Sequence, residues 1–326
     1  MGRLKRTLGP AVPIAGALAV WIVAVAIVPA ETTPATAAVA SGVAAPAQAA
    51  GYVGEDTCLG CHEDQQAYHA TPHGQAANAK TPAATHGCES CHGPGQAHVD
   101  GGGDKTQIKT FTTLTPSEAS EICTTCHNRG SHMMWDSSAH ENRGVACSAC
   151  HSVHDPKSPT AALKTATISE TCAECHRDKV TKTRRSAHMP VSNDPQRPGK
   201  MECTSCHNPH GSTNIKMLKA GTSVSDSCTS CHPEKRGPYL WEHATVADSC
   251  TNCHDPHGSS FDRMLVTKQP MLCQRCHVTT RHPPTVYDNY VRTRTTGANR
   301  LVGRSCVVCH QNIHGSNAAS GKFFLR

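Results

Sequence analysis

The chain has 326 residues and a formal net charge of +6, and its 20 cysteines and 23 histidines far outnumber 3 Trp, 5 Tyr and 4 Phe. Many of its hydrophobic residues are cysteines or lie in an Ala/Val-rich N-terminal stretch, so little Leu, Ile or Phe remains for a core of ordinary size. This composition excludes a typical cytosolic enzyme. It leaves a disulfide scaffold, a metal array or a carrier of covalently attached cofactors.

The N-terminus predicts export. Basic residues between Arg3 and Arg6 precede an apolar run from Ala11 to Val28, and an Ala/Pro/Thr-rich stretch then ends in Ala-Gln-Ala at residues 47–49. This pattern is typical of a secretory signal peptide over residues 1–49, with cleavage near Ala49 and a mature domain over residues 50–326. The apolar run is at the lower limit of what spans a bilayer, so an uncleaved inner-membrane anchor remains open.

All of the cysteines fall into one pattern, C-x-x-C-H, which occurs ten times. Two cysteines one helical turn apart face the same side and can form thioethers with the two vinyl groups of one porphyrin, while the adjacent histidine ligates the iron. The pattern therefore predicts ten covalently bound haem c groups. The attachment cysteines are Cys58, Cys61, Cys88, Cys91, Cys123, Cys126, Cys147, Cys150, Cys172, Cys175, Cys203, Cys206, Cys228, Cys231, Cys250, Cys253, Cys273, Cys276, Cys306 and Cys309. The motif histidines are His62, His92, His127, His151, His176, His207, His232, His254, His277 and His310.

Two other uses of cysteine explain the pattern less well. A disulfide framework accounts for an even number of cysteines in an exported protein, but it gives no reason for a histidine after every second cysteine. Structural zinc would combine two C-x-x-C pairs in one closed site and would leave the adjacent histidines without a role.

The motifs group into five tandem two-haem repeats that start near residues 58, 123, 172, 228 and 273. Each repeat has an odd-numbered motif, a linker with a histidine, an even-numbered motif and a further histidine soon after it. The linker histidines are His73, His140, His188 and His243, and in the fifth repeat the irregularly placed His282. The post-motif histidines are His98, His154, His210, His257 and His314. These ten predict bis-histidine ligation of every iron.

Spacing limits which haem a post-motif histidine can serve. His154, His210 and His257 each follow a motif histidine by three residues, too close for the two to grip opposite faces of one haem. We therefore expect them to ligate neighbouring haems. The three spare histidines, His69, His86 and His132, are expected to be surface or hydrogen-bonded residues.

The expected fold is a multihaem cytochrome c, mostly irregular with short α-helices and almost no β-structure. T-P-S-E at residues 115–118 and T-I-S-E at residues 167–170 predict capping boxes that open short helices leading into odd-numbered motifs. N-P-H-G, D-P-H-G and V-H-D-P after even-numbered motifs predict turns that stop any helix. We expect the porphyrins to form the hydrophobic core.

The basic charge does not point to nucleic acid. Ten haems bring about twenty propionate carboxylates, which outweigh the positive ferric centres and make the mature holoprotein acidic. The basic run from Arg177 to Arg185 is expected to be a solvated helix face, with a docking patch or haem-propionate partners as the alternative.

Three segments carry a resemblance to a known family: G-Y-V-G-E-D-T-C-L-G-C-H, C-H-G-P-G-Q-A-H and C-H-Q-N-I-H-G-S-N-A-A-S-G. Together with the ten motifs, they make residues 51–326 resemble the MtrA/DmsE-type decahaem cytochromes. The resemblance implies a periplasmic-side conduit that inserts into an outer-membrane β-barrel partner and exchanges electrons with periplasmic and extracellular redox partners. It implies no small-molecule substrate.

Two functional classes remain. The first is pure electron transfer, with every iron closed by two imidazoles, either in an outer-membrane conduit or as a soluble periplasmic shuttle. The alternative is a multihaem reductase with one open iron. The ninth haem, held by Cys273, Cys276 and His277, is the candidate for that role because its repeat lacks a regular linker histidine.

Overall fold

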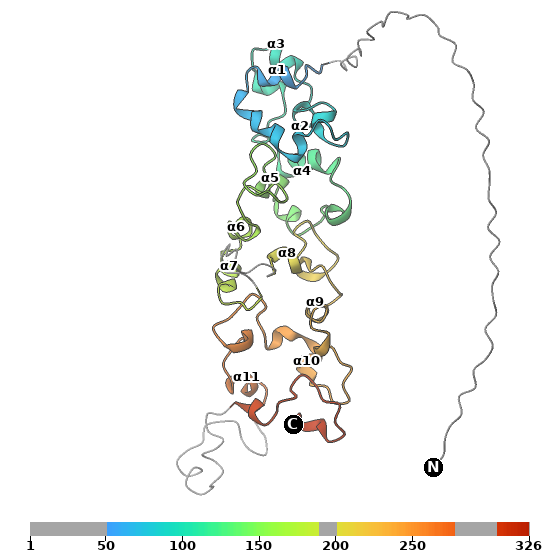
Figure 1. The fold of residues 1–326 in the computed structure, drawn as a ribbon, viewed down its shortest axis with the longest axis vertical. Coiled ribbons are helices and arrows are strands. Elements are labelled where there is room, and N and C mark those ends of the chain that lie inside the picture. The colour runs from blue at the N-terminus through green and yellow to red at the C-terminus, as the bar shows by residue number, and fades with distance from the viewer. Residues whose placement is uncertain (1–50, 189–200, 278–304, 326) are drawn as a thin grey trace, which may run out of the picture. The chain divides into compact units, whose positions relative to one another are not determined.

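The computed structural model describes residues 51–188, 201–277 and 305–325. The chain divides into two units, Met1–Ala47 and Gln48–Arg326, and the described residues all belong to the second. The predicted signal peptide and His282 therefore lie outside the described residues. Within the second unit, short helices are joined by long irregular connections (Figure 1). In this part of the chain, no helix has the length and apolar character needed to cross a membrane.

The described residues contain helices, turns and isolated bridges but no β-strand, which confirms the predicted fold class. The α-helices are α1 (Glu55–Leu59), α2 (Glu89–His92), α3 (Gln96–Asp100), α4 (Pro116–Thr124), α5 (Cys147–Cys150), α6 (Ile168–Ala173), α7 (Arg177–Thr183), α8 (Cys203–Cys206), α9 (Val224–Thr229), α10 (Ala244–Asp248) and α11 (Met271–Gln274). Short 3₁₀ helices cover Glu63–Ala70, Pro72–Gly74, Pro82–Ala84, Lys105–Gln107, Gly130–His132, Glu141–Arg143, Ile215–Met217, Pro233–Lys235, Cys250–Asn252, Asp262–Met264, Cys306–Val308 and Gly321–Phe323.

Helices lead into the odd-numbered motifs, as expected. The first cysteine of each odd-numbered motif lies in one of α1, α4, α6, α9 and α11. Both predicted capping boxes are present: the Thr115 hydroxyl accepts the Glu118 N–H, and the Glu118 carboxylate accepts the Thr115 N–H. Thr167 makes the same exchange with its partner at the start of α6. A capping box opens α9 as well, at Ser223 and Asp226.

The even-numbered motifs occupy single helical turns. Among them, α5 and α8 end at the second cysteine of their motifs, and the motif histidine that follows is extended. The N-P-H-G and D-P-H-G strings form turns and V-H-D-P forms a bend, so none of them continues the helix, as predicted. The chain therefore leaves each even-numbered motif at once and is able to reach another repeat.

The polypeptide has almost no hydrophobic core of its own. Among the described residues, the buried hydrophobic side chains are Tyr68, Ala119, Trp135, Leu163 and Leu218, and no side chain is fully buried. Large apolar side chains are instead exposed: Met133, Ile215, Leu240 and Met271 are each at least 60% exposed. Helices of four to nine residues are marginal on their own in water. They need apolar partners, and the part of the chain that the structure describes supplies few.

Glu89, inside the second motif, is the most highly connected buried carboxylate. It is 3% exposed, and its oxygens accept the backbone N–H groups of Val53, Gly54 and Gly95 at 3.0, 3.0 and 2.7 Å. These bonds hold the segment before the first motif against the second motif. A buried carboxylate is tolerated because the three donors replace its lost water.

Replacing Glu89 tests this connection. We expect Glu89→Ala to destabilise the haem-loaded mature protein by about 3 kcal/mol, because three backbone donors lose their acceptor in a buried site. Guanidinium unfolding followed by haem absorbance measures the loss. The matched control is Glu118→Ala, which removes a carboxylate that also accepts a backbone N–H but is exposed, and it should cost less. Equal losses in the two variants would contradict the role of Glu89.

Candidate haem sites

The two motifs of each repeat meet at their first cysteines. The Cys58 thiol lies beside that of Cys88 in the first repeat, and the Cys123 thiol lies beside that of Cys147 in the second. The same contact joins Cys172 to Cys203, Cys228 to Cys250 and Cys273 to Cys306. Because this cysteine carries one vinyl-derived edge of a porphyrin, the contact brings the two attachment sites of a repeat edge to edge.

Successive repeats approach each other at their second cysteines. Cys91 of the second motif interacts electrostatically with Cys126 of the third, and Cys150 interacts with Cys175. Cys206 and Cys231, and Cys253 and Cys276, make the equivalent approaches. The two kinds of contact alternate along the chain. They relate all ten motifs in numerical order, from Cys58 in the first to Cys306 in the tenth.

A serine helps to bring the two motifs of a repeat together, and the sequence analysis missed it. Ser120 lies three residues before the first cysteine of its odd-numbered motif, and its hydroxyl accepts the N–H of Cys147 at 3.4 Å. In the equivalent positions, Ser225 accepts the N–H of Cys250 at 3.3 Å and Ser169 contacts Cys203. The recurring string Ser-acid-x-Cys was the signal that could have revealed it.

The candidate ligand histidines face one another in pairs, each pair joining a motif histidine to a linker or post-motif histidine. A metal binds a histidine nitrogen at about 2 Å, so two imidazoles on opposite faces of one haem have ring centroids about 6 Å apart. Nine pairs have centroids between 5.8 and 6.3 Å apart. They are His62 with His98, His92 with His154, His127 with His73, His151 with His210, His176 with His140, His207 with His257, His232 with His188, His254 with His314, and His277 with His243.

Eight of these pairs join neighbouring repeats. Each of the four linker histidines that the structure describes faces the odd-numbered motif of the next repeat, as His140 faces His176. Each post-motif histidine from the second repeat onward faces the even-numbered motif of the preceding repeat, as His210 faces His151. Among the linker and post-motif histidines in the described residues, only His98 faces a motif of its own repeat.

The same arrangement holds at the ninth motif. Its own repeat lacks a regular linker histidine, but His243 of the fourth repeat lies 6.1 Å from His277, with the rings 16° from parallel. The histidine that faces the ninth motif therefore comes from the preceding repeat and not from the irregular fifth linker. His282 is outside the described residues.

A hydrogen bond orients the ring of every even-numbered motif histidine. The Nδ1 atoms of these rings lie 2.6 to 2.8 Å from backbone carbonyl oxygens. The pairs are His92 with Lys109, His151 with Ala161, His207 with Lys216, His254 with Arg263 and His310 with Phe323. A carbonyl can only accept, so Nδ1 carries the proton and Nε2 keeps the lone pair that iron requires.

Burial keeps several of the candidate ligand histidines neutral. Burial lowers the pKa of His210 to about 4, and neighbouring histidines, His132 first among them, add to the effect. The same cause, burial, also lowers the pKa values of His73, His127, His154, His243, His257 and His314. Since only a neutral imidazole can bind iron, no proton has to be displaced from these rings near pH 7.

The three spare histidines face no motif histidine at the haem-ligand separation. His69 lies 3.2 Å from the Glu55 carboxylate, and the ring of His86 stacks on Tyr52 at 4.2 Å. His132 stands between two sites, with its ring 4.2 Å from that of His210 and 5.5 Å from that of His127.

The loops after the even-numbered motifs dock on the linker of the preceding repeat. After the sixth motif, the Asn208 amide donates to the Ser131 carbonyl at 2.8 Å, and Gly211 fits against the Met134 carbonyl. After the eighth motif, Lys182 pairs with Asp255 at 2.8 Å, so this residue of the basic run joins two repeats. After the tenth motif, the backbones of Trp241 and Ser316 exchange two hydrogen bonds.

The structure fits haem on observations independent of the motifs. The Nδ1 atoms of His73 and His243 are buried without a hydrogen-bond partner, and apolar side chains lie exposed beside the motifs, as Val308 does in the tenth. Covalent porphyrins would cover such surfaces and bind such rings.

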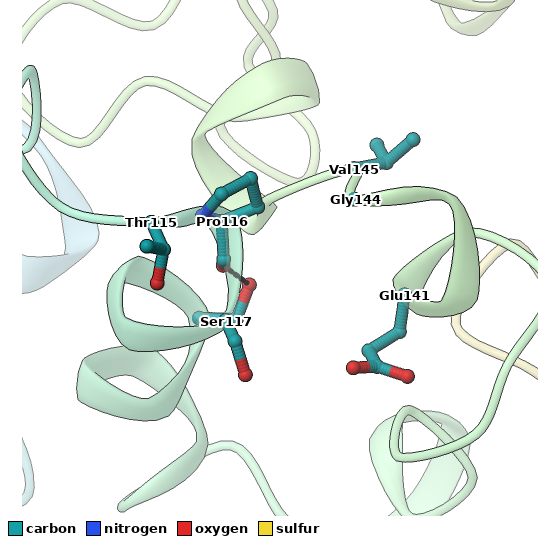
Figure 2. Close-up of a pocket in the computed structure, with 7 residues that line it drawn as sticks. Thr115, Pro116, Ser117, Glu141, Gly144 and Val145 are labelled. Carbon is teal, nitrogen blue, oxygen red and sulfur yellow. Dashed lines mark hydrogen bonds between the residues drawn. The ribbon is translucent and has the colours of Figure 1, made fainter.

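The small cavity of about 200 Å³ between α4 and the loop at residues 141–145 has a different character. Ser117 and Glu141 point into it and no cysteine or histidine lines it (Figure 2).

The comparisons with known proteins agree with this geometry. The family model "Doubled CXXCH motif" matches residues 188–237 and 243–282, "Cytochrome c-type protein NrfB-like" matches residues 88–175, and "Cytochrome c554 and c-prime" matches residues 30–93. The multiheme cytochrome MtrA of Shewanella baltica is 40% identical over 282 residues, covering 84% of this chain and 81% of that protein. This chain belongs to the MtrA family of multihaem cytochromes.

A second relative is more distant. The cytochrome c-type protein NrfB of Escherichia coli is 28% identical over 130 residues, covering 38% of this chain and 66% of that protein. As an MtrA-family cytochrome, the chain carries covalently attached haem c and transfers electrons.

Gly211 tests the docking of the repeats. Its φ of 109° is one that only glycine adopts readily, and an added Cβ would collide with the Met134 carbonyl. We expect Gly211→Ala to destabilise the protein by about 1 to 3 kcal/mol, measured as a lower midpoint of chemical unfolding. The control is Gly102→Ala, where φ is also positive but nothing lies within 4 Å of the new Cβ. A Gly211→Ala midpoint no lower than that of the control would contradict the docking contact.

Proposed function

We propose that this cytochrome is a ten-haem wire that carries electrons from the periplasm to or across the outer membrane. Bound haem iron supplies a one-electron ferric/ferrous couple. The chain provides the attachment points, the axial ligands and the order in which the sites follow one another. No described residue is needed as a catalytic acid, base or nucleophile.

The observation that carries the proposal is the unbroken succession of motif contacts. First cysteines meet within a repeat, as Cys172 and Cys203 do, and second cysteines approach one another between repeats, as Cys206 and Cys231 do. Each attachment site therefore adjoins the one before it and the one after it. Electron tunnelling falls steeply with distance, so this arrangement favours transfer along the chain in motif order.

We propose bis-histidine ligation at every site. The two histidines of each facing pair would bind the same iron. The tenth motif histidine, His310, would then take His282, the candidate predicted from the fifth linker. With two protein ligands per iron, no coordination position remains for a substrate. This arrangement supports an electron carrier over a reductase.

The proposed location and partner rest on the family and on the N-terminal sequence. A signal peptide over residues 1–49 would deliver the chain to the periplasm, where covalent haem attachment takes place. An outer-membrane β-barrel protein is the proposed partner, because the polar backbone of a haem-carrying chain needs a protein channel to pass through a bilayer. Periplasmic donors and extracellular acceptors, or the reverse, would lie at its two ends.

Removing one proposed cross-repeat ligand tests the ligand assignment. We expect His140→Ala to leave the iron attached at Cys172 and Cys175 with one imidazole. A high-spin ferric EPR signal of about one haem in ten should then appear, with the haem content of the protein unchanged. The matched control is His86→Ala, which removes a ring that stacks on Tyr52 and should leave the spectrum fully low-spin. A fully low-spin His140→Ala protein would refute the pairing.

Fractionation of the native cells tests the proposed location. We expect the haem-loaded protein in the outer-membrane fraction, in a complex with a β-barrel protein that survives detergent extraction. Vesicles that contain this complex should reduce an enclosed acceptor when a reductant that cannot cross the membrane is added outside. Recovery of the whole pool as a soluble periplasmic protein, with no vesicle activity, would point to a shuttle.

A further inference from the structure

The loops after the fourth, sixth and eighth motifs close on themselves through one shared set of hydrogen bonds. In the sixth motif, the ring of His207 bonds to the Lys216 carbonyl at 2.8 Å, and the Asn208 N–H donates to the Met217 carbonyl at 2.8 Å. The Lys219 N–H donates to the Cys206 carbonyl, also at 2.8 Å. The fourth and eighth motifs repeat all three bonds with distances between 2.6 and 3.0 Å.

Each of these loops holds two consecutive non-glycine residues in the left-handed region. Lys216 and Met217 have φ values of 55° and 54°, and Arg263 and Met264 have φ values of 56° and 54°. The pair Ala161 and Ala162 has φ values of 59° and 49°. Two such residues in succession are the geometry of a type I′ turn, which favours Asn and Gly, and none of these six is either. A strained conformation that recurs three times at one structural position indicates a function.

The function is visible in what the strained residues contact. In all three loops the first left-handed residue supplies the carbonyl that meets the ring Nδ1 of the motif histidine, and the second supplies the carbonyl that meets the next backbone N–H. The odd-numbered motifs have no equivalent. Over residues 51–188, 201–277 and 305–325 their rings make no such bond to a carbonyl, and the nearest polar approach is His232 to Glu234 at 3.5 Å.

We propose that Ala161–Ala162, Lys216–Met217 and Arg263–Met264 are positioning pairs that aim a carbonyl at the fourth, sixth and eighth axial histidines and thereby lower the reduction potentials of those haems. The inference rests on the proposed function only in taking His151, His207 and His254 as iron ligands.

The sign follows from the donor strength of imidazole. A hydrogen bond from Nδ1–H to a carbonyl increases the basicity of the ring and so of Nε2. A more basic ligand stabilises ferric iron more than ferrous iron, because it donates charge to the higher oxidation state. Breaking the bond should therefore raise the potential. The same bond fixes the ring about its Cβ–Cγ axis, so the strained pair also sets the ligand orientation.

The test compares two triple variants, one whose new residues disfavour a positive φ and one whose new residues accept it. Ala161→Val, Lys216→Val and Arg263→Val place a β-branched residue where φ is positive, which valine tolerates poorly. Ala161→Gly, Lys216→Gly and Arg263→Gly allow the same conformation at no steric cost. Both triples remove the same two positive charges, so a difference between them is not an effect of charge. Haem content, the EPR spectrum and a potentiometric titration of haem absorbance are measured for each.

We expect the glycine triple to titrate as the unaltered protein does. The valine triple should retain its haem content. About three tenths of its haem absorbance change, the share of three haems in ten, should titrate at a higher potential than in the unaltered protein. The g-values of its low-spin EPR signals should also change. A valine triple with full haem content that titrates like the glycine triple would overturn the proposal. Should the valine triple lose haem, the same titration is carried out on the single variants Lys216→Val and Lys216→Gly. A shift to higher potential in Lys216→Val alone supports the proposal, and identical titrations overturn it. A high-spin signal in both triples would instead count against the ligand assignment.

Discussion

The facing pair of imidazoles is the interaction on which the rest of the structure depends. Each pair brings together two histidines that lie far apart in sequence, and eight of the nine observed pairs join neighbouring repeats, as His140 and His176 do. A haem held in such a pair would link two repeats, with its thioethers and one imidazole on one repeat and the second imidazole on the other. Such links would hold in place short helices that are marginal on their own.

Polar contacts follow the same plan at a smaller scale. Glu89 gathers three backbone donors around the first two motifs, and the serines one turn before the odd-numbered motifs contact the even-numbered ones. Gly211 and Gly258 let the loops approach the linkers of the preceding repeats closely. These devices position the attachment cysteines and the rings. Their shared effect is to keep consecutive sites adjacent, which is the property a chain of redox centres requires.

Much of the local structure could be predicted from the sequence. The capping boxes at Thr115 and Thr167 depend on residues three apart, so their side chains and backbone N–H groups find each other whatever the tertiary fold. The turn strings after the even-numbered motifs act equally locally. The pairing of histidines could not be predicted in this way. Reasoning within a repeat placed the weak point at the ninth motif, but His243 from the preceding repeat lies against His277.

The ten C-x-x-C-H motifs, and the spacings that forbid two histidines from sharing one iron, can be read from the sequence by itself. Covalent attachment needs only a five-residue motif, so it is visible in one dimension. Tertiary structure alone decided which histidines face each other, which cysteines meet and where the strained carbonyls point. Those outcomes depend on how each repeat docks on its neighbour. Docking is the sum of many weak contacts, such as Lys182 with Asp255, that no local pattern encodes.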